Sequence, residues 1–459
     1  MEEIPKIPNL VASTGDSYCG TIAESRKRES TGYEKASGEA GGGGNVSSDE
    51  SLELNYFKSA QWTPDGTTLL TSSADNTIRS FILPPDLLND PSSTKTVAPY
   101  TKHAFPSSIN CLAPYPLFNL SDPSTTLYLS APTDFPIRLA NTLSPDATAV
   151  STYNLVSLTT EAWHTPASIL WSSPGHFLTG TDCLISLFDV SRNGEGPITR
   201  MPTIPSKRHL MKGGGVGIRG IASALSQQSS EDGTGILAAG TWTRSIGLYD
   251  TEGTGGTVSV WNVKEAADEI AGIGGTGVTQ TVWSPCGRYL LVVERKSRGV
   301  LVYDVRVEGK LVAWLEGREA DTNQRLSVDV FQGEKGMEVW AGGVDGIVGV
   351  WEGVGTSEGA QKRSWEWAAH NGRRNFLILE IITKGYADPI GSTAMHPSGS
   401  VVATCSGQRG RPHFEEDSDG DESNDTGEDS SDEGSHDETS PSVTSQSRAS
   451  DNTLKIWSI

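Results

Sequence analysis

Basic side chains recur at two kinds of position in this chain, just before strand-like segments and in the short turns between them. These side chains are Lys212, Arg219, Arg244, Lys296, Arg298, Arg318, Arg325, Arg409 and Arg411. A guanidinium group presents a planar fork of donors that matches phosphates and guanine edges, and a lysine supplies a compact charge. The pattern is compatible with an RNA-binding face, and scattered solubilising charge explains the spacing equally well.

The segment DTNQR at residues 321–325 adds a second kind of recognition chemistry. Asn323, Gln324 and Arg325 can each read base edges or sugar hydroxyls in single-stranded RNA loops. The same side chains can instead tie two structural units together through buried hydrogen bonds. The sequence leaves both interpretations open.

No group of residues in the sequence has the spacing that catalysis requires. Residues 215–220 match G-x-G-x-x-G, but a dinucleotide site needs that turn between a parallel strand and a helix, and a β-segment follows here. The 8 histidines and 5 cysteines are not spaced as metal ligands, and no base is signalled beside Cys286. We therefore expect no enzymatic activity, no metal site, no cofactor and no small-molecule substrate.

The elements that would position the basic residues are short strands that recur along the chain. A phrase of alternating apolar residues, ending in an aromatic residue and then Asp or a substitute, occurs seven times, once in a degraded form. The copies are IRSFI (78–82), the degraded IRLAN (137–141), ISLFD (185–189), IGLYD (246–250), VLVYD (300–304), VGVWE (348–352) and LKIWS (454–458). Alternation of this kind, with β-branched and aromatic residues, is typical of strands.

A second phrase precedes the strand in alternate copies and predicts a tight turn. It reads WTPDG (62–66), WSSPG (171–175), WSPCG (283–287) and HPSG (396–399). Blades built from such strands and turns cannot bury their faces alone, but seven of them can close into a ring. We predict an all-β, seven-bladed WD40 β-propeller in which residues 454–458 pair with strands formed by residues 392–405.

The charge distribution divides the chain into a near-neutral core and two acidic segments. The 459 residues carry a net charge of -21, but residues 413–450 hold 13 acidic side chains and one basic side chain. We expect four parts: a disordered N-terminal tail (1–53), the WD40 propeller (54–412), an acidic disordered insertion (413–450) and the closing strand of the last blade (451–459).

Two segments carry separate expectations. Serines in the acidic insertion lie among carboxylates, a pattern that acidophilic kinases recognise, although the insertion can equally be a solvated spacer. These candidate phosphorylation sites are Ser418, Ser423, Ser430 and Ser431.

Residues 371–385 interrupt a connection that should be short, so we interpret them as an insertion or an unremoved intron. No apolar run is long enough to predict a membrane-spanning helix.

Three stretches of the sequence resemble the telomerase Cajal body protein family. They are FKSAQWTPDGTTLLTSSADNTIRSFILPPDL (57–87), GREADTNQRLSVDV (317–330) and HPSGSVVATCSGQR (396–409). Members of this family are WD-repeat proteins that bind small Cajal-body RNAs and telomerase RNA. The resemblance is weak between residues 84 and 136, and the second blade has lost its aromatic residue and its Asp.

The resemblance implies a non-catalytic RNA-binding scaffold that directs small nuclear RNA particles to Cajal bodies in the nucleus. Its partners would be a small Cajal-body or telomerase RNA and the proteins of the particle, without a membrane. The candidate RNA-binding residues are Arg219, Arg244, Arg298, Arg318, Asn323, Gln324, Arg325 and Arg409. The alternative is a protein-interaction propeller, or a scaffold of spliceosomal particles that does not contact RNA directly.

Overall fold

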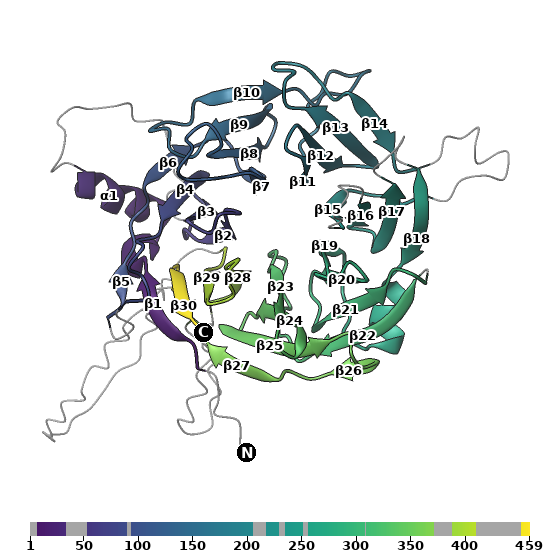
Figure 1. Ribbon diagram of the computed structural model, residues 1–459. Coiled ribbons are helices and arrows are strands. Elements are labelled where there is room, and N and C mark those ends of the chain that lie inside the picture. The colour runs from purple at the N-terminus through teal and green to yellow at the C-terminus, as the bar shows by residue number, and fades with distance from the viewer. Residues whose placement is uncertain are drawn as a thin grey trace, which may run out of the picture.

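The computed structural model describes residues 7–33, 53–89, 93–204, 217–228, 235–250, 256–307, 309–370, 388–409 and 451–459. Seven antiparallel sheets are arranged around a central channel, like the blades of a propeller (Figure 1). The predicted seven-bladed WD40 propeller is therefore confirmed.

Each blade has four strands, and the first strand of each blade lines the channel (Figure 1). The first three blades are β2 (Phe57–Trp62), β3 (Thr68–Ser73), β4 (Thr77–Ile82) and β6 (Thr101–Ala104); β7 (Ile109–Pro114), β8 (Leu127–Pro132), β9 (Ile137–Asn141) and β10 (Ala149–Tyr153); and β11 (Ser168–Ser173), β12 (His176–Thr181), β13 (Leu184–Asp189) and β14 (Thr199–Pro202).

The remaining four blades follow the same plan. They are β15 (Ala222–Gln227), β16 (Ile236–Thr241), β17 (Ser245–Asp250) and β18 (Thr257–Asn262); β19 (Val278–Trp283), β20 (Tyr289–Glu294), β21 (Gly299–Asp304) and β22 (Lys310–Glu316); β23 (Val328–Gly333), β24 (Gly336–Gly342), β25 (Ile347–Val354) and β27 (Trp365–Ala368); and β28 (Ile390–Met395), β29 (Val401–Ser406), β30 (Leu454–Ser458) and β1 (Asn9–Ser13). Two short strands, β5 (Lys95–Thr96) and β26 (Gly359–Gln361), add to blades seven and five.

The seven copies of the aromatic phrase form the third strand of the seven blades. They are β4, β9, β13, β17, β21, β25 and β30, in chain order. The degraded copy, IRLAN, still forms β9 of the second blade. The second blade therefore forms without the aromatic residue. A strand that is buried on one face needs apolar side chains on that face, and no particular position has to be aromatic.

The apolar core lies between the blades. Among the described residues the buried apolar side chains form seven clusters, and each cluster is shared by two adjacent blades. In the first cluster, Phe57 and Phe81 of blade one pack with Leu454 and Ile456 of blade seven. Each blade therefore needs a neighbour on both sides, and an open ring would leave two apolar faces in water.

The tryptophans of the predicted turn phrase connect neighbouring blades. The indole of Trp62 donates to the carbonyl of Ala394 at 2.9 Å, that of Trp171 to Ala113 at 3.3 Å, and that of Trp283 to Ser226 at 3.2 Å. In each case the acceptor lies on the innermost strand of the preceding blade. The phrase thus supplies an inter-blade hydrogen bond as well as a turn.

The last blade is completed by both ends of the described chain. Strand β30 pairs with β29 as predicted, with Trp457 opposite Val402, and it pairs with β1 on its other edge (Figure 1). The expectation of a tail over residues 1–53 is therefore wrong for residues 9–13, which form the fourth strand of blade seven. Residues 451–459 supply its third strand and not its last.

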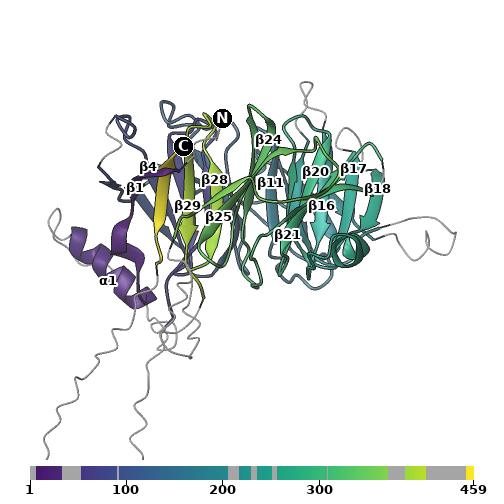
Figure 2. The same cartoon turned by 90° about the horizontal axis from the view of Figure 1, so that it is seen from below.

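Beyond β1 the chain forms a short helix, η1 (Gly15–Tyr18), and then α1 (Ile22–Tyr33), which projects from one rim of the ring (Figure 2). Thr21 and Glu24 cap α1 reciprocally: the Thr21 amide donates to Glu24 at 2.8 Å, and the Glu24 amide donates to Thr21 Oγ1 at 3.3 Å. Arg26 then donates to the carbonyl of Asp75, in a turn of blade one.

We call this side of the ring the α1 rim. Besides α1 it comprises the loops that lead into innermost strands (among them 154–167, 217–221 and 317–327) and the turns between second and third strands (among them 242–244 and 295–298). In the described part of the chain, no helix is long and apolar enough to cross a membrane.

A buried polar network holds the α1-rim end of blade seven. The imidazole of His370 lies 2.9 Å from Thr404 Oγ1 and 3.5 Å from Asp451, and Trp457 donates to the same Thr404 oxygen at 2.9 Å. Burial lowers the pKa of His370, which keeps the imidazole neutral at pH 7. The network connects the loop from blade six to the second and third strands of blade seven.

Strand β1 provides the first prediction. Val11 is fully buried in the cluster between blades seven and one, so Val11→Asp should place an unpaired carboxylate in the closing strand. We expect a loss of several kcal/mol of unfolding free energy, measured by chemical denaturation, together with aggregation. Ile7→Asp, at a position 77% exposed just before the strand, is the matched control and should leave stability unchanged. Equal stability of the two variants would contradict closure by β1.

The His370 network provides a pH-dependent prediction. His370 is neutral in the folded state, whereas in the unfolded state it takes up a proton below a pKa of about 6.5. Its contribution to the free energy of unfolding is therefore complete above pH 6.5 and is lost as the pH falls below that value. The wild-type protein should therefore lose roughly 1 kcal/mol between pH 7 and 5.5 from this group. His370→Gln should be less stable at pH 7 and should lack this part of the pH dependence. Trp457→Phe also removes a hydrogen bond but keeps the imidazole, so its pH dependence should match the wild type. A His370→Gln profile parallel to the wild type would contradict the assignment.

Candidate nucleic-acid interface

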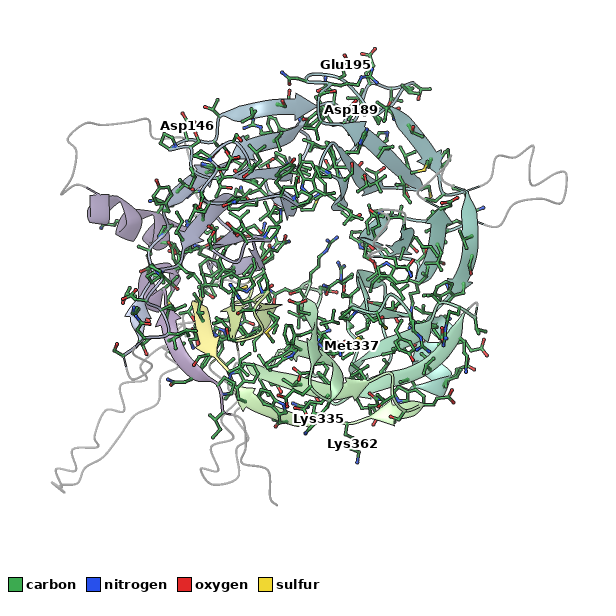
Figure 3. All side chains as sticks on the ribbon, viewed as in Figure 1. Asp146, Asp189, Glu195, Lys335, Met337 and Lys362 are labelled. Carbon is green, nitrogen blue, oxygen red and sulfur yellow. The ribbon has the colours of Figure 1, made fainter. Side chains whose placement is uncertain are left out.

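The channel opens at the α1 rim into two adjoining cavities that share Arg325 and Lys58. The inner cavity, of about 370 Å³, is lined by residues from the first halves of the innermost strands and by the loop into blade six. The outer cavity, of about 440 Å³, lies over blades two to four and includes Trp163, Asp182 and Trp242. Nitrogen-tipped side chains project into the central opening (Figure 3). These two cavities, with the residues around them, form the channel mouth.

Arg325 spans the channel mouth. It comes from the loop into blade six, and its Nη1 donates to the carbonyl of Ala167 at the start of blade three, at 3.0 Å. Burial lowers the pKa of Arg325 below the ordinary arginine value, and the nearby charge of Arg295 also lowers it. Within the described residues, no carboxylate forms an ion pair with this guanidinium group.

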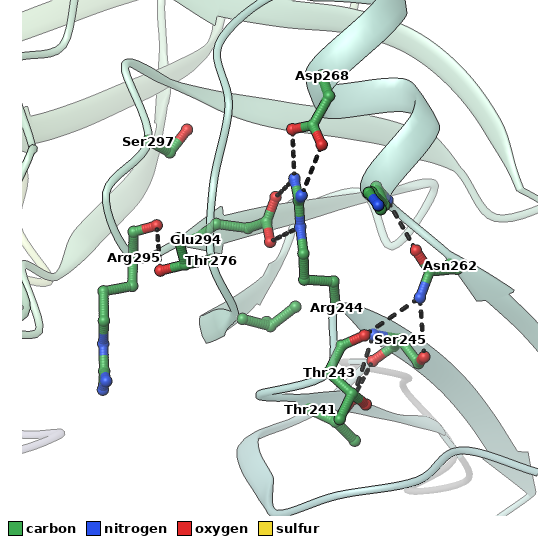
Figure 4. A network of polar contacts seen from close by, with 12 residues as sticks. Thr241, Thr243, Arg244, Ser245, Asn262, Asp268, Thr276, Glu294, Arg295 and Ser297 are labelled. Carbon is green, nitrogen blue, oxygen red and sulfur yellow. Dashed lines mark hydrogen bonds and ion pairs between the residues drawn. The ribbon is translucent and has the colours of Figure 1, made fainter.

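An arginine and two partly exposed tryptophans lie next to Arg325. The guanidinium of Arg295 stacks over the ring of Trp242 at 5.1 Å, and its side chain runs away from the ion-paired Arg244 (Figure 4). Trp242 is 41% exposed and Trp163 is 38% exposed, and both line the outer cavity. Large aromatic faces beside uncompensated cations are chemically suited to bases and phosphates.

Lys58 adds a third cation to the channel mouth. It lies on β2, where its ammonium group donates to Ser108 Oγ at 2.8 Å. Burial lowers the pKa of Lys58, as expected for a cation held away from water. Asp182 is the one carboxylate in the described lining of the outer cavity. The channel mouth therefore carries a local positive charge although the chain as a whole is acidic.

Three of the predicted arginines are exposed on the α1 rim. Arg219 leads into blade four, Arg298 lies in a turn of blade five, and Arg409 follows the second strand of blade seven. Arg409 has its guanidinium 3.8 Å from Glu53 with 76% of its side chain exposed, which leaves it largely accessible. Lys296 is also exposed in the blade-five turn. These four side chains have the accessibility that phosphate contacts require.

Arg244, by contrast, is committed to an internal ion network. Its guanidinium binds Glu294 through Nε (2.7 Å) and Nη2 (2.9 Å), and Asp268 through Nη1 (2.8 Å) and Nη2 (2.9 Å) (Figure 4). Asp268 lies on the single-turn π-helix η3 (Ala266–Ile270), so Arg244 ties blade four to blade five. Four of its five guanidinium N–H groups are used in these bonds. We therefore correct the expectation that Arg244 contacts RNA.

Arg318 and Gln324 need a similar correction. Arg318 is 3% exposed, and it donates to the carbonyls of Gly342 and Leu326 at 3.1 and 2.8 Å. Burial lowers its pKa to about 10. Gln324 donates to the carbonyl of Gly407 and so joins blade seven, whereas Asn323 is exposed. The inter-blade interpretation of DTNQR therefore holds for Gln324, and RNA contact by Asn323 stays a prediction.

Several predicted positions fall outside the described residues. These are Lys212, Arg411, the serines at 418, 423, 430 and 431, and the insertion at 371–385. Within the described ranges, no three His, Cys, Asp or Glu side chains converge as metal ligands would.

Four residues of the channel mouth were missed by sequence reasoning: Lys58, Trp163, Trp242 and Arg295. Trp242 stands two positions before Arg244 in a turn already identified, and Arg295 stands directly before Lys296. A search for aromatic residues in the same turns as the basic ones would have found Trp242. Trp163 has no such signal, because its place beside the channel depends on the course of a 14-residue loop.

Comparison with known proteins agrees with this architecture. The model of the WD domain, G-beta repeat, matches residues 55–81, which form the first three strands of blade one. Telomerase Cajal body protein 1 from Mesocricetus auratus is 28% identical over 362 residues, covering 77% of this chain, and the human protein of that name is 26% identical over 359 residues, also covering 77%. The chain is thus similar to telomerase Cajal body proteins over about three quarters of its length.

The family resemblance seen in the sequence is thus confirmed. The chain spans 59% of the hamster protein and 57% of the human one, so these relatives contain further sequence. The guanine nucleotide-binding protein negative regulator 1 from Schizosaccharomyces pombe is 27% identical over 303 residues, which cover 65% of this chain and 71% of that protein. Sequence similar to this propeller therefore occurs in relatives that carry different names.

The Arg244 network gives a stability prediction. Arg244→Leu would leave Glu294, whose side chain is 2% exposed, without its cation. Burial already raises the pKa of Glu294, so we expect a loss of about 3–5 kcal/mol at pH 7.5 and a smaller loss near pH 5, where the carboxyl group takes up a proton. The double variant Arg244→Leu, Glu294→Leu should recover most of that stability. A negligible loss in the single variant would return Arg244 to the RNA-binding candidates.

Proposed function

We propose that this protein is a non-catalytic RNA-binding scaffold that recognises a small Cajal-body RNA or telomerase RNA at its α1 rim. In this proposal it acts in the nucleus and directs the RNA and its particle proteins to Cajal bodies. The ring is a rigid platform, and binding to its loops requires no chemical turnover.

The observation that carries the proposal is the distribution of cations around the channel mouth. Arg219, Arg298 and Arg409 are exposed on the α1 rim, while Lys58 and Arg325 lie at the centre without a carboxylate ion partner among the described residues. Uncompensated buried cations are costly, and an anionic ligand would offset that cost. The names of the hamster and human relatives refer to telomerase and the Cajal body, which agrees with an RNA ligand.

The alternative is a propeller that binds only proteins, or a scaffold of spliceosomal particles without direct RNA contact. Two observations favour it: the yeast relative is named for the regulation of a guanine nucleotide-binding protein, and the loop into blade six also carries the exposed Glu319 and Asp321. A small RNA binder usually has a clearer basic surplus than the core of this chain. The salt dependence of binding distinguishes an RNA-binding propeller from one that binds only proteins. Binding to RNA releases condensed counterions, and binding to a protein partner does not.

The test is a pair of charge-reversed triple variants. The first variant changes Arg219, Arg298 and Arg409 to Glu. The second variant is the control and changes Arg288, Lys335 and Lys362 to Glu. These three control residues lie away from the α1 rim, and Lys335 and Lys362 are labelled in Figure 3. Full-length proteins would be titrated with total small nuclear RNA at several salt concentrations. The α1-rim variant should bind at least about tenfold more weakly and lower the salt slope by about 2, as expected for three lost phosphate contacts. Equal affinities of both variants would contradict the proposal, as would salt-independent capture of RNA.

A further inference from the structure

The outer cavity of the channel mouth has features of a binding site that phosphate recognition alone does not need. Its volume of about 440 Å³ falls within the range of small-molecule pockets. Its lining combines Trp163 and Trp242 with Asn110, His164 and Arg325. Cations on the α1 rim suffice to bind a backbone, so the aromatic residues and the hollow require a further explanation.

The two tryptophans are placed as stacking surfaces. Trp163 leads into blade three, and Trp242 lies in the turn between the second and third strands of blade four. Both indoles are more than a third exposed, although other tryptophans of the ring, such as Trp340 and Trp351, are 1% exposed. Stacking on an indole contributes binding energy for all four bases, because each base has a flat π-face.

The cations of the channel mouth lie close enough to receive a phosphate beside such a base. Arg295 stacks on Trp242, and its Nε atom is buried without a hydrogen-bond partner among the described residues. Arg325 lines both cavities and uses one guanidinium nitrogen for the carbonyl of Ala167, and Lys58 also lines both. Two cations in the lining and a third stacked on Trp242, with donors still unused, are suited to an anionic ligand.

Polar side chains in the lining can read the edge of a base. Asn110 is exposed, and its Oδ1 accepts from Thr133 at 3.4 Å, which leaves the amide N–H donors available. His164 stands beside Trp163 in the same lining. An amide and an imidazole next to a stacking platform match the hydrogen-bonding edges of an unpaired base.

From this geometry we propose that the outer cavity holds one unpaired nucleotide of the bound RNA, with its base against Trp163 or Trp242 and its phosphate facing Arg295, Arg325 and Lys58. This inference rests on the proposed RNA-binding function and deepens it. It favours an RNA with an unstacked base in a loop over a continuous duplex, because a paired base cannot enter the cavity. An acidic peptide would use the cations but not the two indole faces.

The test compares two probes on the full-length protein. Titration with adenosine, guanosine, cytidine and uridine monophosphates should quench part of the tryptophan fluorescence, and a short single-stranded oligoribonucleotide should bind more tightly than a duplex of the same length. The double variant Trp163→Ala, Trp242→Ala should lose the nucleotide quenching and bind the single strand about 5- to 100-fold more weakly, with an unchanged salt slope. Trp163→Phe keeps an aromatic face and should lose much less. Thermal melting checks that each variant is folded.

The outcomes separate this inference from the function on which it rests. If the tryptophan variant binds single strand, duplex and mononucleotides as the wild type does, while the Arg219, Arg298, Arg409 variant loses RNA, the nucleotide pocket is wrong and the RNA-binding face stands. If neither variant changes RNA binding, the proposed function itself is wrong. If a phosphoserine peptide competes for the cavity and mononucleotides do not, the site recognises a phosphopeptide and the inference is overturned. Loss of single-strand affinity and of quenching together supports it.

Discussion

Each blade of this protein buries its apolar faces only against its neighbours. In the described part of the chain, the seven buried clusters all lie between adjacent blades, so opening the ring would expose apolar faces that no separate core replaces. Closure depends on β1, which hydrogen-bonds to β30 and brings Val11 into the cluster between blades seven and one. The amide of Thr14 donates to Leu454 and its hydroxyl accepts from the Leu454 amide, which extends the pairing by one residue. The radius of the channel, and the position of every loop at its mouth, follow from this closure.

A closed ring explains how scattered basic residues become one site. Arg325 and Lys58 are separated by more than half of the chain, but the ring places both in the lining of the same cavity. The acidic side chains Asp146, Asp189 and Glu195 lie near the outer circumference of the ring (Figure 3). Salt screens exposed charges that are separated by more than a Debye length. The overall charge of -21 is therefore a poor guide to the local field, because the cations meet where the blades converge.

The features that could be predicted from the sequence are those carried by local periodicity. The aromatic phrase located the third strand of each blade, including β30 (Leu454–Ser458), because a strand and its turn are encoded within about ten residues. Strand β1 was missed because its five residues, NLVAS, carry neither the aromatic residue nor the Asp of the phrase. Its pairing with β30 is a contact between distant parts of the chain, which no local pattern signals.

The candidate site was predicted in part, and the errors have a common cause. Arg219 and Arg244 both stand within three residues of the strand that follows, but Arg219 is exposed whereas Arg244 meets Glu294 of the next blade and Asp268 of η3. Whether an arginine is free or paired depends on carboxylates that are distant in sequence. The same limit applies to Trp163, because only the folded loop brings it beside the channel.

The central claim is that RNA binds at the α1 rim with its contacts converging on the channel mouth. Photocrosslinking tests this most directly, using the full-length protein, a single-stranded oligoribonucleotide that contains 4-thiouridine, and mass spectrometry of the crosslinked peptides. The account predicts crosslinks in the loop 154–167 and the turns 242–244 and 295–298, reduced by competing single-stranded RNA. Crosslinks confined to the opposite rim, for example to the turns 62–66 and 283–287, would contradict it.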